Sequence, residues 1–299
     1  MKLNGLHLLL TYQCTFECDH CFVWGSPWQS GTMTIDTIRK ILDQAKETCS
    51  VGWIYFEGGE PFLYYQTMVA GINTAKELGF KVGIVTNSYW ATSEEDALLW
   101  LSPLVGKVQD LTISSDLFHF TEKVSQQSKY VTRIAEQLNI PLGIICIEQP
   151  ENPGVSSIGQ IPSEAASIMY RGRAVDKLAP HATLFPAEVF STCPHENLAD
   201  PGRVHIDPFG NLHICQGLSL GNIFTSSIKE ICDDFDPHTH PIIGPLLAGG
   251  PYKLSTINNI PISRNYADAC HFCYEARKYL RDQYTDILTP DQMYGILYK

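Results

Sequence analysis

The chain has 299 residues, of which 44% are hydrophobic, and this suits one large α/β domain or one of moderate size with a smaller appendage. Its 21 basic and 32 acidic side chains give a net charge of −11, which argues against a nucleic-acid backbone or an anionic membrane as a partner, and no apolar run has the length of a membrane span. Ten cysteines without a charged-then-apolar leader indicate a reducing cytoplasm and metal ligation rather than disulfides.

The first half of the chain alternates strand and helix patterns. Thr34 is a helix cap with an amphipathic pattern after it, and overlapping capping boxes at Thr92 and Ser93 begin another helix. This alternation predicts an α/β fold with a parallel sheet, and six units fit a partial (β/α)6 TIM-like barrel rather than a complete one. We predict strands at 5–11, 51–56, 81–86, 108–114 and 140–147, a weaker sixth at 182–185, and helices after 34, over 68–78, after 93 and ending at 138.

After about residue 150 the chain becomes rich in proline, glycine and loops. Two short alternating segments within 203–215 flank Pro208-Phe209-Gly210-Asn211 and predict a β-hairpin, and a helix is expected at 268–284. We therefore predict a barrel domain over 1–185 and a smaller domain of hairpin plus helix over 186–299.

Three cysteines follow the first strand on one short loop. Cys14, Cys18 and Cys21 form a CxxxCxxC pattern, and three thiolates can hold three irons of a four-iron cluster while the fourth iron stays open to a substrate. A zinc site more usually pairs two CxxC motifs or adds histidines, and packing alone would not gather three cysteines on a polar loop.

This spacing resembles the signature of the radical S-adenosylmethionine (SAM) enzymes, although His20 stands where the family usually has an aromatic residue. The resemblance implies a [4Fe-4S] cluster that binds SAM and cleaves it reductively to methionine and a 5′-deoxyadenosyl radical. That radical removes a hydrogen atom from the substrate.

Further polar motifs end the later strands, where ligands gather in such sheets. Gly58-Gly59-Glu60 is followed by proline and resembles the GGEP motif that holds the amino group of SAM. Thr86-Asn87-Ser88 resembles the family's Thr-Asn-Gly turn. The resemblance thus implies cofactor-binding roles for residues at three strand ends: Gly58, Gly59, Glu60, Asn87, Ser114 and Asp116. The Gly58-Gly59-Glu60 segment and Asn87 also have a plainer interpretation as turn residues. Glu148, after the fifth strand, is either a substrate contact or a solvated carboxylate.

A second cysteine set is spread over the last third of the chain. Cys193, Cys215, Cys270 and Cys273 surround the hairpin and open the last helix, which resembles the twitch domain, the smaller relative of the SPASM domain. The resemblance implies one fully ligated auxiliary [4Fe-4S] cluster; zinc held by the same four cysteines is the alternative. Cys49, Cys146 and Cys232 fit structural roles. The segment Arg171-Gly172-Arg173-Ala174 resembles a GRA segment of members with an extra cluster, and it binds either an anionic substrate or a core carboxylate.

Together these features imply an oxidoreductase that removes a hydrogen atom and then an electron, with the auxiliary cluster as electron acceptor. The cysteine arrangement resembles that of inosamine dehydrogenases within the superfamily, which oxidise an alcohol to a ketone. The expected partners are a small-molecule or peptide substrate and a reducing donor such as flavodoxin or ferredoxin. The sequence assigns no catalytic side chain. The alternatives are a maturase that modifies a ribosomal peptide, which the lack of room for an N-terminal leader-binding domain disfavours, and a non-catalytic two-cluster electron carrier or zinc-stabilised binding protein.

Overall fold

A computed structural model describes residues 1–48, 50–121, 125–147, 168–262 and 265–297. The N-terminal half contains alternating strands and helices: β1 Gly5–Thr11, α1 Ile35–Glu47, β2 Trp53–Gly58, η1 Pro61–Tyr64, α2 Tyr65–Glu77, β3 Lys81–Thr86, α3 Glu94–Leu101, η2 Ser102–Leu104, β4 Asp110–Ser114, α4 Gln126–Gln137 and β5 Leu142–Ile145. The second half contains α5 Arg173–Lys177, η4 Ala179–His181, η5 Ala187–Val189, β6 Arg203–Ile206, β7 Asn211–Cys215, β8 Leu218–Asn222, α6 Ile228–Asp234, α7 Ile243–Ile257, α8 Ala269–Leu280 and η6 Asp291–Tyr294. Helix α7 is kinked at Gly249 and Gly250.

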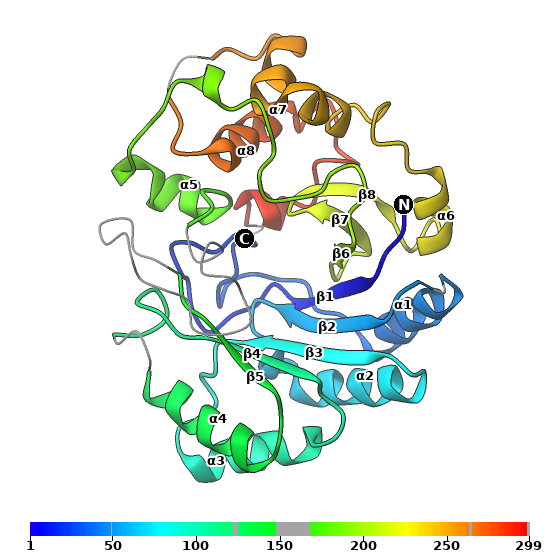
Figure 1. The fold of residues 1–299 in the computed structure, drawn as a ribbon, viewed down its shortest axis with the longest axis vertical. Helices are drawn as coiled ribbons and strands as arrows, with labels where there is room; N and C mark the ends of the chain where they lie inside the picture. Colours follow the sequence, from blue (N-terminus) through cyan, green and yellow to red (C-terminus); the bar gives the residue numbers. More distant parts are fainter. Residues whose placement is uncertain (49, 122–124, 148–167, 263–264, 298–299) are drawn as a thin grey trace.

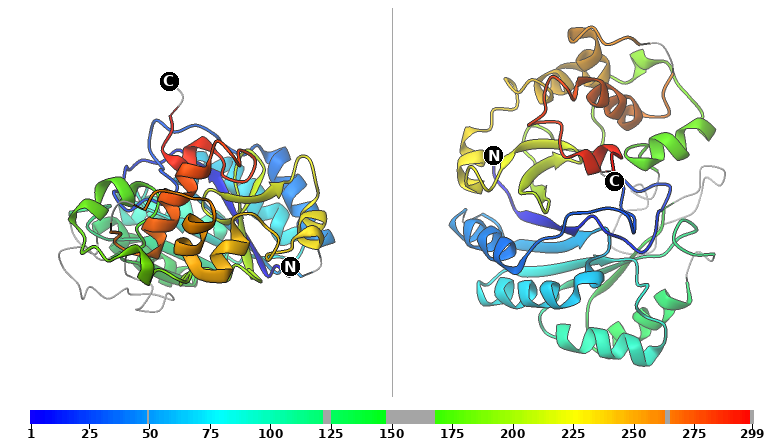
Figure 2. Two further views of the ribbon diagram at one scale, coloured as in Figure 1. Left: turned by 90° about the horizontal axis from the view of Figure 1, so that it is seen from above. Right: turned by 180° about the vertical axis from the view of Figure 1, so that it is seen from behind.

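The strands of the described residues form one sheet in the order β5-β4-β3-β2-β1-β6-β7-β8. Strands β1 to β6 run parallel, whereas β7 and β8 continue the sheet in antiparallel fashion. Helices α3 and α4 lie at the lower end of the molecule in Figure 1 and α7 and α8 at the upper end, with the sheet between them. The last described residues lie beside the loop that follows β1 (Figures 1 and 2). A Cβ on Gly295 would lie 2.8 Å from the Trp24 ring.

The predicted α/β fold with its parallel strands is confirmed, and several element boundaries agree with the sequence pattern. The strands at 5–11 and 81–86 have the expected limits, and the Thr34 hydroxyl caps α1 by accepting a hydrogen bond from the Thr37 N–H. Strand β2 begins two residues later than expected, and α2 begins at Tyr65 because the 3₁₀ turn η1 leads directly into it.

The sixth parallel strand is not where the sequence pattern suggested. Residues 182–185 form no strand, and Phe185 makes only an isolated antiparallel bridge with Tyr266. Instead β6, Arg203–Ile206, pairs in parallel with β1 while it also forms the predicted hairpin with β7. The hairpin is therefore part of the same sheet as the N-terminal strands.

The two faces of β1 contact different surroundings. Leu6, Leu8 and Leu10 belong to the core formed with α1 and α2, whereas Leu9 packs with residues of the second half of the chain. Alternate residues of a strand point to opposite faces, so His7 lies on the same face as Leu9. No helix of the described residues is long and apolar enough to cross a membrane.

Candidate functional site

The three N-terminal cysteines lie together in the loop after β1. Cys14 and Cys18 are buried and Cys21 is partly exposed, and backbone N–H groups point at two of the sulfurs, Phe16 N at Cys14 Sγ (3.5 Å) and Gly25 N at Cys21 Sγ (3.2 Å). Burial raises the pKa of Cys14 to about 12, and the neighbouring thiol of Cys21 adds to this. Buried thiols that oppose one another's ionisation are suited to a bound metal centre, whose positive charge stabilises thiolates.

Arg173 braces this loop from the start of α5. Its buried guanidinium donates one hydrogen bond to the carbonyl of Cys18 (2.8 Å) and another to that of Gly25 (2.8 Å), and its own backbone N–H donates to the carbonyl of Cys21 (2.9 Å). At Gly172, with a φ of +61°, a Cβ would lie 2.6 Å from the Cys21 carbonyl oxygen. The segment 172–173 therefore sets the shape of the cysteine loop.

We expect Arg173→Met to lower the free energy of unfolding by about 2–4 kcal/mol and to reduce the iron taken up by the cysteine loop, because two buried carbonyls lose a charged donor. Iron content after anaerobic reconstitution and denaturant unfolding measure both effects. Arg133→Met is the control, since Arg133 is exposed and pairs only with Glu94 in the described residues. Wild-type iron uptake by Arg173→Met would contradict the bracing role.

Gly58 and Gly59 bring the end of β2 against the end of β1. A Cβ on Gly58, which has a φ of +136°, would lie 2.4 Å from the Thr11 carbonyl oxygen, and one on Gly59 would lie 2.0 Å from that of Gln13. The Gly59 N–H donates to the Thr11 carbonyl at 2.7 Å. Both positions thus require glycine because the backbone that leads into the cysteine loop passes so close.

Glu60 connects two strand ends rather than facing solvent. Its buried carboxylate accepts hydrogen bonds from the backbone N–H groups of Phe62 (3.0 Å) and Asn87 (2.7 Å) and from the Thr86 hydroxyl (2.8 Å). Burial raises the pKa of Glu60 to about 7, although the hydrogen bonds from Asn87 and Phe62 oppose the rise. Glu60 therefore holds the turn after β3 beside the end of β2.

That turn places Asn87 on the cysteine loop. The Asn87 Nδ2 group donates to Cys14 Sγ (3.5 Å) and to the Thr15 hydroxyl (3.1 Å). The next residue, Ser88, has a φ of +62°, the left-handed conformation that favours glycine, and its buried hydroxyl has no hydrogen-bond partner among the described residues. The sequence comparison with a Thr-Asn-Gly turn thus agrees with the backbone geometry.

We expect Ser88→Gly to stabilise the protein by about 1 kcal/mol, because it removes a strained side chain and an unpaired buried hydroxyl. The melting temperature should rise by about 2–4 °C. Ser88→Ala is the matched variant: it removes the same hydroxyl and keeps the strain, so it should gain less. A lower melting temperature for Ser88→Gly than for the wild type would contradict this interpretation.

Asp116 orders the loop after β4 and follows the half-buried Ser114 and the fully buried Ser115. Its buried carboxylate accepts hydrogen bonds from the backbone N–H groups of Phe118 (2.9 Å) and Ile147 (3.2 Å) and lies 2.7 Å from His119 Nδ1. Burial alone would raise the pKa of Asp116, but the contact with His119 lowers it below its ordinary value. His20 of the cysteine loop packs against the Phe118 ring at 4.7 Å, so the ends of β4 and β5 adjoin the cysteines.

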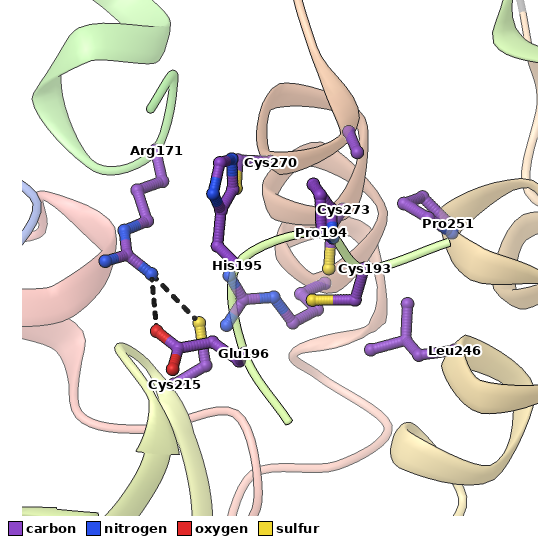
Figure 3. Close-up of a pocket in the computed structure, with 12 residues that line it drawn as sticks. Arg171, Cys193, Pro194, His195, Glu196, Cys215, Leu246, Pro251, Cys270 and Cys273 are labelled. Atoms are coloured by element: carbon purple, nitrogen blue, oxygen red, sulfur yellow. Dashed lines mark hydrogen bonds and ion pairs between the residues drawn. The ribbon is translucent and has the colours of Figure 1, made fainter. Parts of the chain in front are cut away.

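The second cysteine set encloses a cavity above the hairpin (Figure 3). Cys193 comes from the loop before β6, Cys215 from the end of β7, and Cys270 and Cys273 from the first turn of α8. The Asp268 side chain caps that turn by accepting the His271 N–H. Four thiols separated by 21, 54 and 2 residues therefore line one cavity.

Two buried arginines also line this cavity. Arg171 Nη1 lies 3.5 Å from Cys215 Sγ and 3.3 Å from Glu196 Oε1, as the dashed lines in Figure 3 show. Arg277, one helical turn after Cys273, donates to the Gln216 carbonyl at 2.7 Å. The buried Nε atoms of both arginines have no hydrogen-bond partner among the described residues. Two guanidinium groups with unused donors beside four thiols suit a centre of net negative charge.

The structure brings the predicted residues of the first site together at one edge of the sheet and gathers the four later cysteines separately. Of the two sequence interpretations of the segment 171–174, Arg171 does pair with a carboxylate, that of Glu196. Sequence reasoning missed Arg277, although its position four residues after Cys273 on a helix was the available signal. Cys49 and Glu148 lie outside the described residues.

Comparisons with known proteins agree with this geometry. The family model described as Radical SAM superfamily matches residues 8–113. YydG of Bacillus subtilis, named for a role in peptide biosynthesis, is 27% identical over 111 residues, 37% of this chain and 35% of that protein. The tungsten-containing aldehyde ferredoxin oxidoreductase cofactor-modifying protein of Pyrococcus furiosus is 36% identical over 93 residues, 31% of this chain and 26% of that protein. The matches thus span about a third of each relative or less.

A solved structure shares the fold over most of the chain. The crystal structure of BtrN in complex with AdoMet and 2-DOIA superposes with a TM-score of 0.53 at 14% identity, and the match covers 87% of each chain.

Proposed function

Because the family-model match over residues 8–113 supports membership of this chain in the radical SAM superfamily, we propose that it is a radical SAM enzyme that oxidises its substrate with the help of two iron–sulfur clusters. The observation that carries the proposal is the loop of Cys14, Cys18 and Cys21, braced by Arg173 and contacted by Asn87. A [4Fe-4S] cluster on three cysteines supplies an open iron for SAM and the electron that cleaves it.

The cofactor-binding residues are proposed from this arrangement. Gly58 and Gly59 place backbone groups beside the cysteine loop, and Asn87 reaches the loop directly. The carboxylates of Glu60 and Asp116 are engaged by protein donors, so we assign them the task of holding the strand ends in position for SAM. The hydroxyl of the partly exposed Ser114 is the group we propose for contact with the SAM ribose.

We propose an auxiliary [4Fe-4S] cluster on Cys193, Cys215, Cys270 and Cys273. A cluster with four thiolate ligands carries net negative charge, and the buried guanidinium groups of Arg171 and Arg277 would offset it. In this assignment residues 1–185 form a partial barrel and 186–299 a twitch-like unit whose hairpin extends the barrel sheet. The cluster would accept the electron that the substrate radical loses.

The substrate we favour is a small molecule, oxidised by loss of a hydrogen atom, an electron and a proton. A peptide is the second candidate, because the similarity to YydG covers part of the chain and that protein is named for peptide biosynthesis. The electron for SAM cleavage would come from a reduced flavodoxin or ferredoxin.

Anaerobic reconstitution with iron and sulfide, followed by dithionite and SAM, tests the proposal. We expect 5′-deoxyadenosine and methionine to form, and neither to appear when dithionite or SAM is omitted. A fully loaded and reduced protein that forms no 5′-deoxyadenosine would instead favour a two-cluster electron carrier, and a protein that retains zinc and takes up no iron would favour a zinc-stabilised binding protein.

A further inference from the structure

A row of polar side chains crosses the inner face of the sheet, and the proposed function leaves it unused. The strand register aligns His205 of β6, His7 of β1, Tyr55 of β2, Gly83 of β3 and Asp110 of β4 at one level. The corresponding layers of closed barrels are filled mainly by bulky branched residues. A polar layer at this place therefore indicates a role other than packing.

Alternation along the strands puts these groups on the face away from α1 and α2. The residues on either side of His7 and His205 belong to the helix-facing core, as do Ile54 and Phe56 on either side of Tyr55. Glu57 follows Phe56 and so shares the inner face with Tyr55. Three neighbouring strands thereby bring one carboxylate and two imidazoles together.

The geometry of this trio is compact. Glu57 Oε2 lies 3.0 Å from His7 Nδ1, and Glu57 Oε1 lies 3.1 Å from His205 Nε2. The three potential ligand atoms all lie within 4.8 Å of one another. Although Glu57 Oε1 lies close to His205 Nε2, it is buried without a hydrogen-bond partner among the described residues. The other ring nitrogen of His205, Nδ1, is also buried without one among these residues. His7 Nδ1 and Glu57 Oε2 form a hydrogen bond, whereas Glu57 Oε1 and His205 Nε2 are close without being aligned for one, as expected where ligands converge on an ion.

The His7 ring is held in place by its neighbours. It stacks on the Tyr55 ring at 4.5 Å with an interplanar angle of 9°. The Tyr55 hydroxyl in turn donates to Asp110 Oδ2 at 2.9 Å, across β3, where a Cβ on Gly83 would lie 2.2 Å from the tyrosine ring. Contacts of this kind, made to a ligand residue by its neighbours, orient the side chains that bind a metal ion.

We propose that His7, Glu57 and His205 bind a divalent transition-metal ion on the inner face of the sheet. Two imidazoles and one carboxylate suit zinc or iron(II) and leave coordination positions open. Glu57 directly precedes Gly58 and Gly59, so one ligand of this ion belongs to the strand that leads into the proposed SAM-binding glycines.

Zinc binding to the reconstituted full-length protein tests the site. After equilibrium dialysis with Zn²⁺, we expect one zinc per chain in addition to an unchanged iron content. X-ray absorption at the zinc edge should show nitrogen and oxygen neighbours at about 2.0–2.1 Å rather than sulfur at about 2.3 Å. Glu57→Gln and His205→Ala should each weaken zinc binding at least tenfold, whereas His181→Ala, a change at an exposed histidine outside the row, should bind like the wild type.

Three results would overturn the proposal: no bound zinc, sulfur neighbours only, or equal zinc binding by the wild type and Glu57→Gln. The absorption spectrum of the wild type decides the matter even if a variant fails to fold. Iron content and 5′-deoxyadenosine formation, measured in the same samples, report on the proposed function separately.

Discussion

Replacing Cys14, Cys18 or Cys21 with alanine is expected to abolish 5′-deoxyadenosine formation from SAM and dithionite. Each substitution removes one of three cluster ligands, and the remaining two thiols cannot retain a four-iron cluster with one open iron. If the auxiliary cluster is present, about four iron atoms per chain should remain. Product analysis by liquid chromatography and iron determination on the same sample measure both effects.

Cys232→Ala is the matched control for these variants. Cys232 is a free, buried cysteine of α6 in the core formed with α1, away from both cysteine sets, so its loss removes a sulfur without touching either proposed cluster. It should keep wild-type iron content and product formation. An N-terminal cysteine variant that still forms the product at the wild-type rate would show that the loop does not carry the reactive cluster.

Replacing Cys270 and Cys273 together with alanine should lower the iron content from about eight to about four atoms per chain. Both thiols come from one helical turn, and their removal leaves Cys193 and Cys215 unable to hold a cluster alone. We expect SAM cleavage to persist, because the first cysteine loop is built from other elements. Substrate oxidation should be lost because no acceptor remains for the second electron.

Iron and sulfide analysis with electron paramagnetic resonance checks this prediction. The Cys14→Ala variant is the natural comparison, since it should lose the other four irons and keep the spectrum of the auxiliary cluster. Purified protein with one zinc per chain at these cysteines, and never more than about four irons, would instead support the zinc site considered from the sequence.

Local patterns predicted much of the fold. The strands at 5–11 and 81–86, the cap at Thr34 and the turn around Gly210 depend on residues close in sequence, and the structure places them as expected. The sixth strand was wrongly expected at 182–185. Arg203–Ile206 carries an alternation that fits a hairpin equally well, and only its parallel pairing with β1, nearly 200 residues earlier, makes it the sixth strand.

Around the two cysteine sets, too, local sequence indicated some residues, whereas the folded structure determined their partners. The sequence marks Arg173 by its segment and Arg277 by its position one helical turn after Cys273, but it does not show that their partners are the carbonyls of Cys18 and Gln216, which come close only in the folded chain. Glu60 had a signal in its motif, yet its bonds to Thr86 and Asn87 depend on how β2 lies beside β3.

The amino-acid sequence alone determined the class of chemistry, since three cysteines within eight residues and glycines beside a glutamate specify ligands through covalent spacing. Folding decided which charges compensate the buried thiols, which strand completes the parallel sheet, and that His7, Glu57 and His205 converge. The contact of His7 with Glu57 and the pairing of β1 with β6 join residues separated by 50 to about 200 positions, and strand register, rather than the spacing along the chain, brings such side chains within bonding distance.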